Sequence, residues 1–312
     1  MTSAASFWPS LVASTLALVG LAVLSVTIGP DSVDPQYTLY QVRLPRFLTG
    51  VALGAALALA GNLLQLATQN PLSEPELLGI NQSAVFAVVV VLLFAGSVSA
   101  TTILMAALVG GATSGTAILL MTSSGAFPRE RLILAGLTLA FFFGSASSGL
   151  LILKESDLFE LLHWTAGKLS GAGWSDFALC TSVLAVAVLL SVFRATAWNA
   201  LQLGEEGARS LGLDPVTLRV EMMVVTVCLC SVAVAVAGPI GFVGIIIPHL
   251  SRLLAGLDYR FRVPMSLLTG AILVAGADLL ARSVIHPVEI PVGIVTALLG
   301  APYFLYRAQR TA

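Results

Sequence analysis

Residues 47–66 read "FLTGVALGAALALAGNLLQL", twenty residues without a charge. An α-helix of this length crosses the roughly 30 Å hydrocarbon core of a bilayer, so the segment predicts a transmembrane helix. Gly50, Gly54 and Ala58 recur every four residues and therefore share one face of that helix. Small residues at this spacing let two helices pack closely in lipid, so we expect this face to be a helix–helix contact.

The composition extends this membrane character to the whole chain. Of 312 residues, 57% are apolar and 10% are charged, and the mean hydropathy is +0.97. About a quarter of the residues of a soluble domain are charged, so the chain is classed as an integral membrane protein. The net charge of −1 provides no basic field for nucleic acid. Cys180, Cys228 and Cys230 lack the spacing of a metal site or a disulfide framework.

Ten apolar runs predict an all-α integral membrane protein of about ten transmembrane helices, in one transmembrane domain over residues 1–312. The first run has no basic start and is about 20 residues long, so we interpret it as a retained helix and not as a cleaved signal peptide. The eighth run is short and could be a half-helix that follows the "AGPIGFVG" break. The runs lie near 10–29, 47–66, 80–96, 99–121, 131–152, 176–193, 218–238, 242–256, 264–283 and 291–307.

The distribution of basic residues predicts the orientation. With ten helices both termini lie on one side, and placing them in the cytoplasm puts ten basic residues inside and five outside, as the positive-inside rule favours. The inner ones are Arg129, Arg131, Arg194, Arg209, Arg219, Arg252, Arg260, Arg262, Arg307 and Arg310, and the outer ones are Arg43, Arg46, Lys154, Lys168 and Arg282. An aromatic belt would then have Trp164 and Trp174 at the outer interface, and Trp8 and Trp198 at the inner one.

Arg43 and Arg46 form a close outer pair in "QVRLPRFLTG", against the general rule. One interpretation is local: Asp31 and Asp34 lie upstream and would pair with them, or the side chains extend to water. The other interpretation is that Arg282 completes an outer basic patch for an acidic partner.

The longest inner connection, residues 203–219, reads "LGEEGARSLGLDPVTLR". Glu205 and Arg209 are spaced for an ion pair on a short helix, which Gly212 would end. The Asp-Pro dipeptide that follows is typical of the start of the next helix. Such a short helix offers its leucines to a partner, although an ordinary interfacial loop is the alternative.

Asp278 is the one acid well inside a predicted transmembrane helix. An intramembrane acid suggests ion coupling by default, but Arg282 lies four residues on, and we favour a structural pair between them. The histidines, His163, His249 and His286, are isolated, so no metal site is indicated.

The phosphate loop of nucleotide-binding proteins is missing from the sequence. The nearest piece, "GKLS" at 167–170, lacks the required upstream glycine, because Leu162 stands there. No nucleophile–base or metal motif indicates an enzyme either. If ATP drives transport, the ATPase is therefore a separate chain.

The order of several motifs resembles the permease subunits of type II ATP-binding cassette importers for iron–siderophores, haem and vitamin B12. The resemblance covers nearly the whole chain from Arg43 onward. It rests on "RLPR" at 43–46, "GAALALAGNLLQ" at 54–65, "NPLSEPELLGIN" at 70–81, "LILAGLTL" at 132–139, "WTAGKLSGAGW" at 164–174, "LGLDPVTLR" at 211–219, "GPIGFVGIIIPHLSRLLAGLDYRFRVP" from 238, and "GADLLARSVIHPVEIPVGIVTALLGAPYFLY" after it.

This resemblance implies the type II importer permease fold in the bacterial cytoplasmic (inner) membrane, and several partners. These are a second permease subunit, identical or homologous, two cytoplasmic ATPase subunits, and a periplasmic or lipid-anchored substrate-binding protein. It implies no cofactor in this chain, with ATP used by the partner subunits. Arg43, Arg46 and Arg282 would face the acidic binding protein. A coupling helix at about 200–214 would contact the ATPase through Leu203, Gly204, Gly207, Ala208, Leu211, Gly212 and Leu213.

The resemblance also implies a pathway along the subunit interface, near the fifth and tenth helices. The expected substrate is an iron–siderophore, iron–citrate included, then haem, then cobalamin. Lys168 departs from the family pattern at the outer face and leaves the substrate open. The rival function is an ion-coupled secondary transporter, for which the Gly and Pro residues at 238–248 would provide a broken helix.

Overall fold

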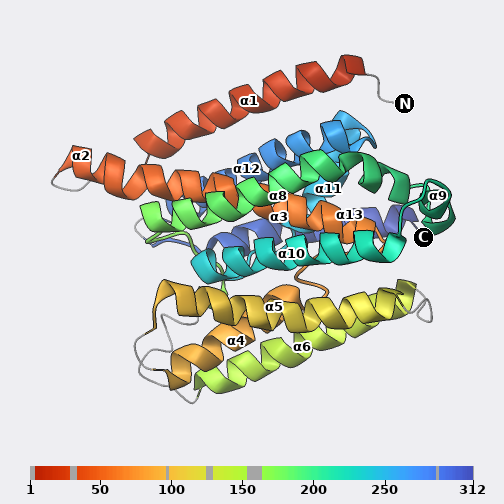
Figure 1. Ribbon diagram of the computed structural model, residues 1–312. Coiled ribbons are helices and arrows are strands. Elements are labelled where there is room, and N and C mark those ends of the chain that lie inside the picture. Colours follow the sequence, from red (N-terminus) through yellow and green to blue (C-terminus); the bar gives the residue numbers. More distant parts are fainter. Residues whose placement is uncertain are drawn as a thin grey trace.

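The computed structural model describes residues 4–28, 34–95, 98–123, 129–152, 164–285 and 288–311, and this part of the chain consists of helices and connecting turns (Figure 1). The helices are α1 (Ala4–Thr27), α2 (Pro35–Tyr37), the π-helical turn η1 (Thr38–Arg43), α3 (Leu44–Ala67), α4 (Ile80–Phe94), α5 (Ala100–Ser123), α6 (Arg129–Ile152), α8 (Trp174–Leu201), α9 (Glu205–Ser210), α10 (Pro215–Ala237), α11 (Val243–Ala255), α12 (Tyr259–Ser283) and α13 (Val292–Thr311).

Each of the ten predicted apolar runs coincides with one of these helices, which confirms the predicted fold class. Seven candidate spans are long and apolar enough to cross a membrane, while α4, α11 and the first part of α13 are shorter apolar helices. The 13 residues of α11 rise only about 20 Å, too little to cross the bilayer core alone. The run at 242–256 is therefore a half-helix, as the sequence allowed.

The predicted break before α11 is also present. α10 ends at Ala237, and α11 begins at Val243 after five residues without regular helix. Gly238 has φ of 72° and ψ of −173°, a backbone conformation that only glycine adopts readily, whereas Phe242, with φ of 68° and ψ of −16°, has a left-handed conformation that is strained for a large side chain. Glycine is required at the first position for a second reason, since a Cβ there would strike the carbonyl of Trp164.

α3 is the central helix of the bundle, and it packs on α8, α10, α11 and α12 (Figure 1). Almost every residue from Pro45 to Ala67 is buried. A Cβ at Gly54 would overlap the backbone carbonyl of Gly270 in α12, and the reverse also holds. The small-residue face predicted for this helix is therefore a close contact with α12.

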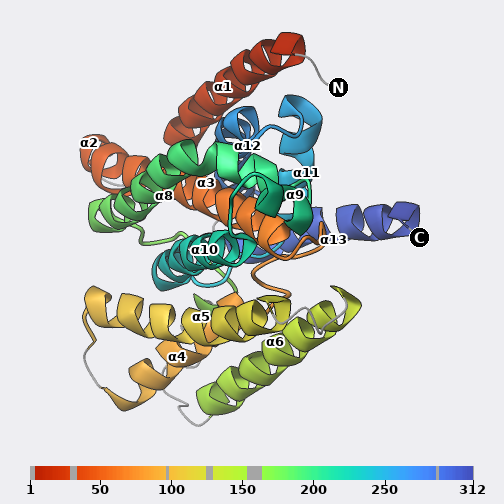
Figure 2. The same ribbon diagram turned by 45° about the vertical axis from the view of Figure 1, so that its right-hand side comes forward.

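The other helices lie on two sides of this core. α4, α5 and α6 form a second group that α10 joins to the centre, whereas α1 packs against α12 at the opposite edge (Figure 2). α1 leaves large apolar side chains exposed, among them Trp8 and Leu16, as a lipid-facing helix would.

The bundle has two distinct ends. α9 and both chain termini lie at one of them, the α9 end, and α2 lies at the other, the α2 end (Figure 1). Shared placement of the termini is what a ten-helix chain requires. The N-termini of α10 and α12 also lie at the α9 end, where Asp214 and Asp258 cap them through hydrogen bonds from backbone N–H groups.

Candidate functional site

The short helix α9 presents two apolar side chains at its end of the bundle. Leu203 and Leu211 flank it and are 73% and 62% exposed. The left-handed glycines Gly204 and Gly212 begin and end the helix, while Ala208 faces inward and is fully buried. This arrangement is a small raised platform with an apolar rim, which we call the α9 platform.

The α9 platform is tied to the core through Glu205. Its carboxylate accepts a bond from Arg209 at 3.3 Å, the predicted pair, and another from Arg219 of α10 at 2.6 Å. Nε of Arg219 also donates to the carbonyl of Ala67, the last residue of α3, at 3.2 Å. The exposed Arg209 pair contributes about 0–1 kcal/mol, so the buried Arg219 is the firmer link. These contacts connect α9 to α10 and to the end of α3.

A buried ion pair joins α3 and α12 near the α2 end. Arg46 donates from Nε and Nη2 to the Asp278 carboxylate at 2.8–3.1 Å, and from Nη1 to Glu289 at 2.9 Å. Asp278 is 3% exposed and Arg46 8%. Asp278 is therefore ion-paired, as predicted, but its main partner is Arg46. The predicted partner, Arg282, is farther away, with Nε 3.8 Å from the carboxylate.

The other two outer arginines bind backbone carbonyls. Arg282 is 5% exposed and donates to the carbonyls of Ser25 and Ile28 at the end of α1. Arg43 is half-buried and donates to the carbonyl of Val26 at 2.7 Å. The three arginines therefore do not form an exposed patch, because the side chains of Arg46 and Arg282 are buried and bonded to groups within the protein. Asp31, one proposed partner of the pair, lies outside the described residues.

The loop between α3 and α4 folds back into the protein and carries two buried carboxyl groups. Glu74 is 2% exposed, and its carboxyl group accepts hydrogen bonds from the backbone N–H groups of Phe242 and Gly244. Its second oxygen has no hydrogen-bond partner among the described residues. Burial, with repulsion from Glu76, raises the pKa of Glu74 to about 8. The folded chain therefore holds this group largely protonated at neutral pH.

Glu76 lies beside a groove of 780 Å³ that runs along α6. Its carboxylate accepts bonds from Asn81 at 3.0 Å and from Gln82. Ser145 and Ser148 of α6 add hydroxyl groups to the same groove. The groove therefore combines the polar groups of Glu76, Gln82 and the α6 serines with the large apolar residues that α6 otherwise exposes. This combination suits a polar molecule that passes along an apolar surface.

The relatives of the chain decide its identity. The family model described as the FecCD transport family matches residues 3–310. The chain belongs to this family. It is 37% identical to the Fe(3+)-citrate import system permease protein YfmD of Bacillus subtilis over 90% of this chain and 84% of that one. It is 36% identical to the Fe(3+) dicitrate transport system permease protein FecC of Escherichia coli, over 97% and 93%.

The fold of this FecCD permease also matches a solved structure. An inward-facing metal-chelate type ABC transporter superposes with a TM-score of 0.84 at 32% identity, and the match covers 95% of this chain and 98% of the other. The resemblance found in the motifs is thus confirmed, and the chain is a membrane-spanning permease of an ABC transporter that works with ATPase partners. Permeases of this family are transport subunits and not enzymes.

Metal-binding groups do not gather anywhere in the part of the FecCD permease that the structure describes. There, no three His, Cys, Asp or Glu residues are placed to hold a metal ion. The cysteines are free thiols, with Cys180 and Cys230 buried in apolar surroundings. These thiols are core residues.

Several polar residues that shape these sites are missed by the sequence patterns. Arg219 links the α9 platform to α3, and Glu76 contributes to the α6 groove. Both stand in motifs that carry the family resemblance, but the sequence assigned neither of them a contact or a role. A usable signal was present in the second case, since two acids on either side of Pro75 without a nearby cation are unusual in an apolar chain.

Proposed function

We propose that this chain is one of two permease subunits, identical or homologous, of an ATP-driven importer in the bacterial cytoplasmic membrane. Its substrate is a ferric chelate of the citrate or siderophore class. The observation that carries the substrate class is the near full-length match to two permeases named for ferric citrate, from Bacillus and from Escherichia. Residues 1–312 form a single transmembrane domain in this proposal, with the α9 end and both termini in the cytoplasm.

The chelate passes along α6 and α13, at the interface with the second permease. The α6 groove supports this route, because Glu76, Gln82 and the α6 serines provide hydrogen bonds for a polar ligand. Phe141 and Phe142 of α6 are 72% and 63% exposed, and they suit packing against another subunit or lipid.

The α9 platform is the coupling element to the ATPase. The proposed contacting residues are Leu203, Gly204, Gly207, Leu211, Gly212 and Leu213. Ala208 was predicted among them, but its side chain is fully buried against the core, so it supports the helix from beneath. The exposed leucines support this role because they offer an apolar surface to a partner. The ion pair between Glu205 and Arg219 supports it because it attaches α9 to α10, so that a movement of α9 would also move α10.

The binding protein docks at the α2 end. Of the three arginines predicted for this contact, the half-buried Arg43 is the one whose side chain is nearest to the surface. Arg46 and Arg282 support the docking face by holding α1, α3 and α12 together, through the contacts described above.

Uptake by the reconstituted transporter tests the function. The chain is co-expressed with its ATPase and binding protein, and ATP-dependent uptake of radioactive iron is compared for ferric citrate, a ferric hydroxamate and haem. Ferric citrate or a siderophore should be imported, and a protonophore should leave uptake unchanged while ATP is held constant. If none of the three compounds is imported, the proposed function is wrong.

A pair of substitutions at Leu211 tests the coupling role separately. Leu211→Glu places a charge in the apolar rim and should abolish uptake while the protein still inserts, whereas Leu211→Met should keep wild-type uptake. Normal uptake and normal ATPase copurification in Leu211→Glu would refute the role of α9 without touching the substrate class.

A further inference from the structure

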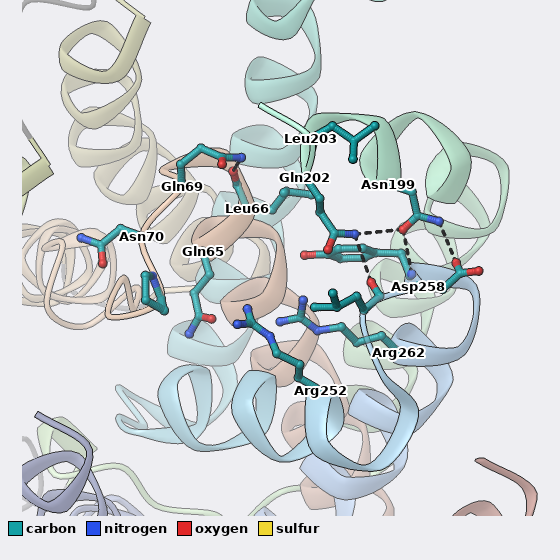
Figure 3. A pocket seen from close by; sticks show the side chains of 13 residues that line it. Gln65, Leu66, Gln69, Asn70, Asn199, Gln202, Leu203, Arg252, Asp258 and Arg262 are labelled. Atoms are coloured by element: carbon teal, nitrogen blue, oxygen red, sulfur yellow. Dashed lines mark hydrogen bonds between the residues drawn. The ribbon is translucent and has the colours of Figure 1, made fainter. Parts of the chain in front are cut away.

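A second pocket lies at the α9 end, between α3, α8, α11 and α12 (Figure 3). Its volume of 560 Å³ is within the range of about 300–1,000 Å³ that small-molecule sites occupy. Its polar side chains come from α3 and α8, from the turns that follow these two helices, and from α11 and α12; they include Gln65, Gln69, Asn199, Gln202, Arg252 and Arg262. The transport route along α6 does not include this pocket, so its chemistry needs a separate account.

Arg262 is a buried cation that its surroundings do not satisfy. The residue is 2% exposed. Nη2 donates to the Pro248 carbonyl at 3.3 Å, and the guanidinium carbon lies 5.1 Å from the centre of the Tyr259 ring. Nε has no hydrogen-bond acceptor among the described residues. A buried charged donor without an acceptor is costly, so a group that accepts from it would be stabilising.

A second cation faces the same space. Arg252 of α11 lies near enough for the two positive charges to repel each other, and both guanidinium groups point toward Gln65 in Figure 3. Neither arginine forms an ion pair within the described part of the chain. Two like charges converging on one cavity favour an anion between them.

The one acid in the lining is already engaged. Asp258 accepts from the Asn199 side chain at 2.7 Å and from the backbone N–H of Arg260 at 2.9 Å, where it caps α12. Its charge is thus partly offset by the helix N-terminus. The pocket keeps a positive excess, with two guanidinium groups against one carboxylate that is held by its own partners.

We propose that this pocket binds a small oxoanion, a phosphate group or its close equivalent, between Arg252 and Arg262. Arg262 supplies Nε, and Arg252, which is exposed at the pocket mouth, completes the clamp from α11. Guanidinium groups suit this ligand because their planar forks match its oxygens. The anion would join α11 to α12 beside Leu203, where the α9 platform begins. Binding itself does not depend on the proposed transport function.

Phosphate titration of the purified full chain tests the site. The protein is placed in nanodiscs of neutral phosphatidylcholine, and binding of inorganic phosphate at constant ionic strength is measured by calorimetry and by the shift of the melting temperature. Arg252→Gln and Arg262→Gln should each weaken binding about tenfold or more, as expected for the loss of a charge-assisted hydrogen bond.

Arg260→Gln is the matched control. Arg260 belongs to the same helix and is exposed, but it does not line the pocket, and its side chain bonds to Thr196 at 2.9 Å. Its substitution should leave phosphate binding unchanged. An equal loss in all three variants would show that only general charge attraction is at work and would overturn the site. If Arg262→Gln fails to fold, the exposed Arg252 decides the question.

A second set of nanodiscs distinguishes the source of the phosphate group. In discs with anionic phosphatidylglycerol, a lipid headgroup in the pocket would compete with free phosphate and raise the melting temperature of wild type but not of Arg252→Gln. Absence of competition assigns the pocket to a soluble anion. If wild type binds no phosphate in neutral discs and gains no Arg252-dependent stability from the anionic lipid, the proposal is wrong.

Discussion

Replacing Asp278 by asparagine removes one charge from the pair that joins α12 to α3. The carboxylate is 3% exposed and holds Arg46 with contacts of 2.8–3.1 Å. Removing one partner of a buried ion pair destabilises a protein by about 3–5 kcal/mol, because the other charge is left without compensation. Arg46 keeps its 2.9 Å bond to Glu289, so we expect the lower end of that range, about 3 kcal/mol.

The measurement is the free energy of unfolding in mixed detergent micelles, with Arg209→Gln as the control. Arg209 belongs to an exposed pair whose loss should lower stability by about 0–1 kcal/mol. A double variant, Arg46→Met with Asp278→Leu, replaces the buried pair by apolar side chains and should recover part of the loss, because Glu289, which then lacks Arg46, is partly exposed to solvent.

Two results would refute this reasoning. In the first, Asp278→Asn is no less stable than the Arg209→Gln control, which would mean that the pair is not desolvated. In the second, the double variant is less stable than Asp278→Asn alone, so that the loss does not come from an uncompensated charge. Collapse of uptake in wild type on adding a protonophore, with ATP held constant, would instead give Asp278 a role in proton coupling.

Three further predictions concern packing, pH and docking. Gly54→Ala should lower the melting temperature, because the added methyl group would overlap a backbone carbonyl of α12. Gly149→Ala is the control and should not lower it, since the space around Gly149 is open. Equal effects of the two substitutions would rule out close packing as the cause. The folded pKa of Glu74, about 8, exceeds its ordinary 4.5, so stability is greatest below pH 4.5 and falls until about pH 8. Glu74→Gln should flatten this fall in melting temperature, and an unchanged slope would contradict it. Arg43→Glu should weaken docking of an acidic binding protein and reduce its salt dependence in a nanodisc binding assay; unchanged affinity and salt slope would refute the docking role.

The sequence predicted the helices and α9 well because their signals are local. Uncharged runs of about 20 residues, the Gly/Pro break before α11 and the Asp-Pro cap of α10 all depend on neighbours within a few positions. The same is true of Gly54, whose spacing marked a close contact, although its partner, Gly270, could not be predicted from local signals.

The partners of charged residues were harder to predict, because they are distant in sequence. Arg46 and Asp278 are 232 positions apart, and only the packing of α3 on α12 brings them together. Trp198 was expected at the membrane interface by its position near a helix end. Its side chain is fully buried within the protein, with its ring edge-on to that of Tyr259. Position along a helix predicts depth in the membrane but not which side of the helix faces protein.

α3 connects the two ends of this permease as a single rod. Near the α2 end Arg46 fixes it to Asp278 of α12, and at the α9 end the carbonyl of Ala67 receives Arg219, which also holds Glu205 of α9. Between these points the backbones of α3 and α12 are in close contact at Gly54 and Gly270. Sliding of one helix along the other would bring larger side chains into this contact, where they do not fit. We therefore expect a displacement of α9 to move α3 and α12 together. If α3 and α12 move relative to the other helices, some segment has to change its backbone angles. Among the described residues, the non-helical segment 238–242 between α10 and α11, with positive φ at Gly238 and Phe242, is best suited to do so.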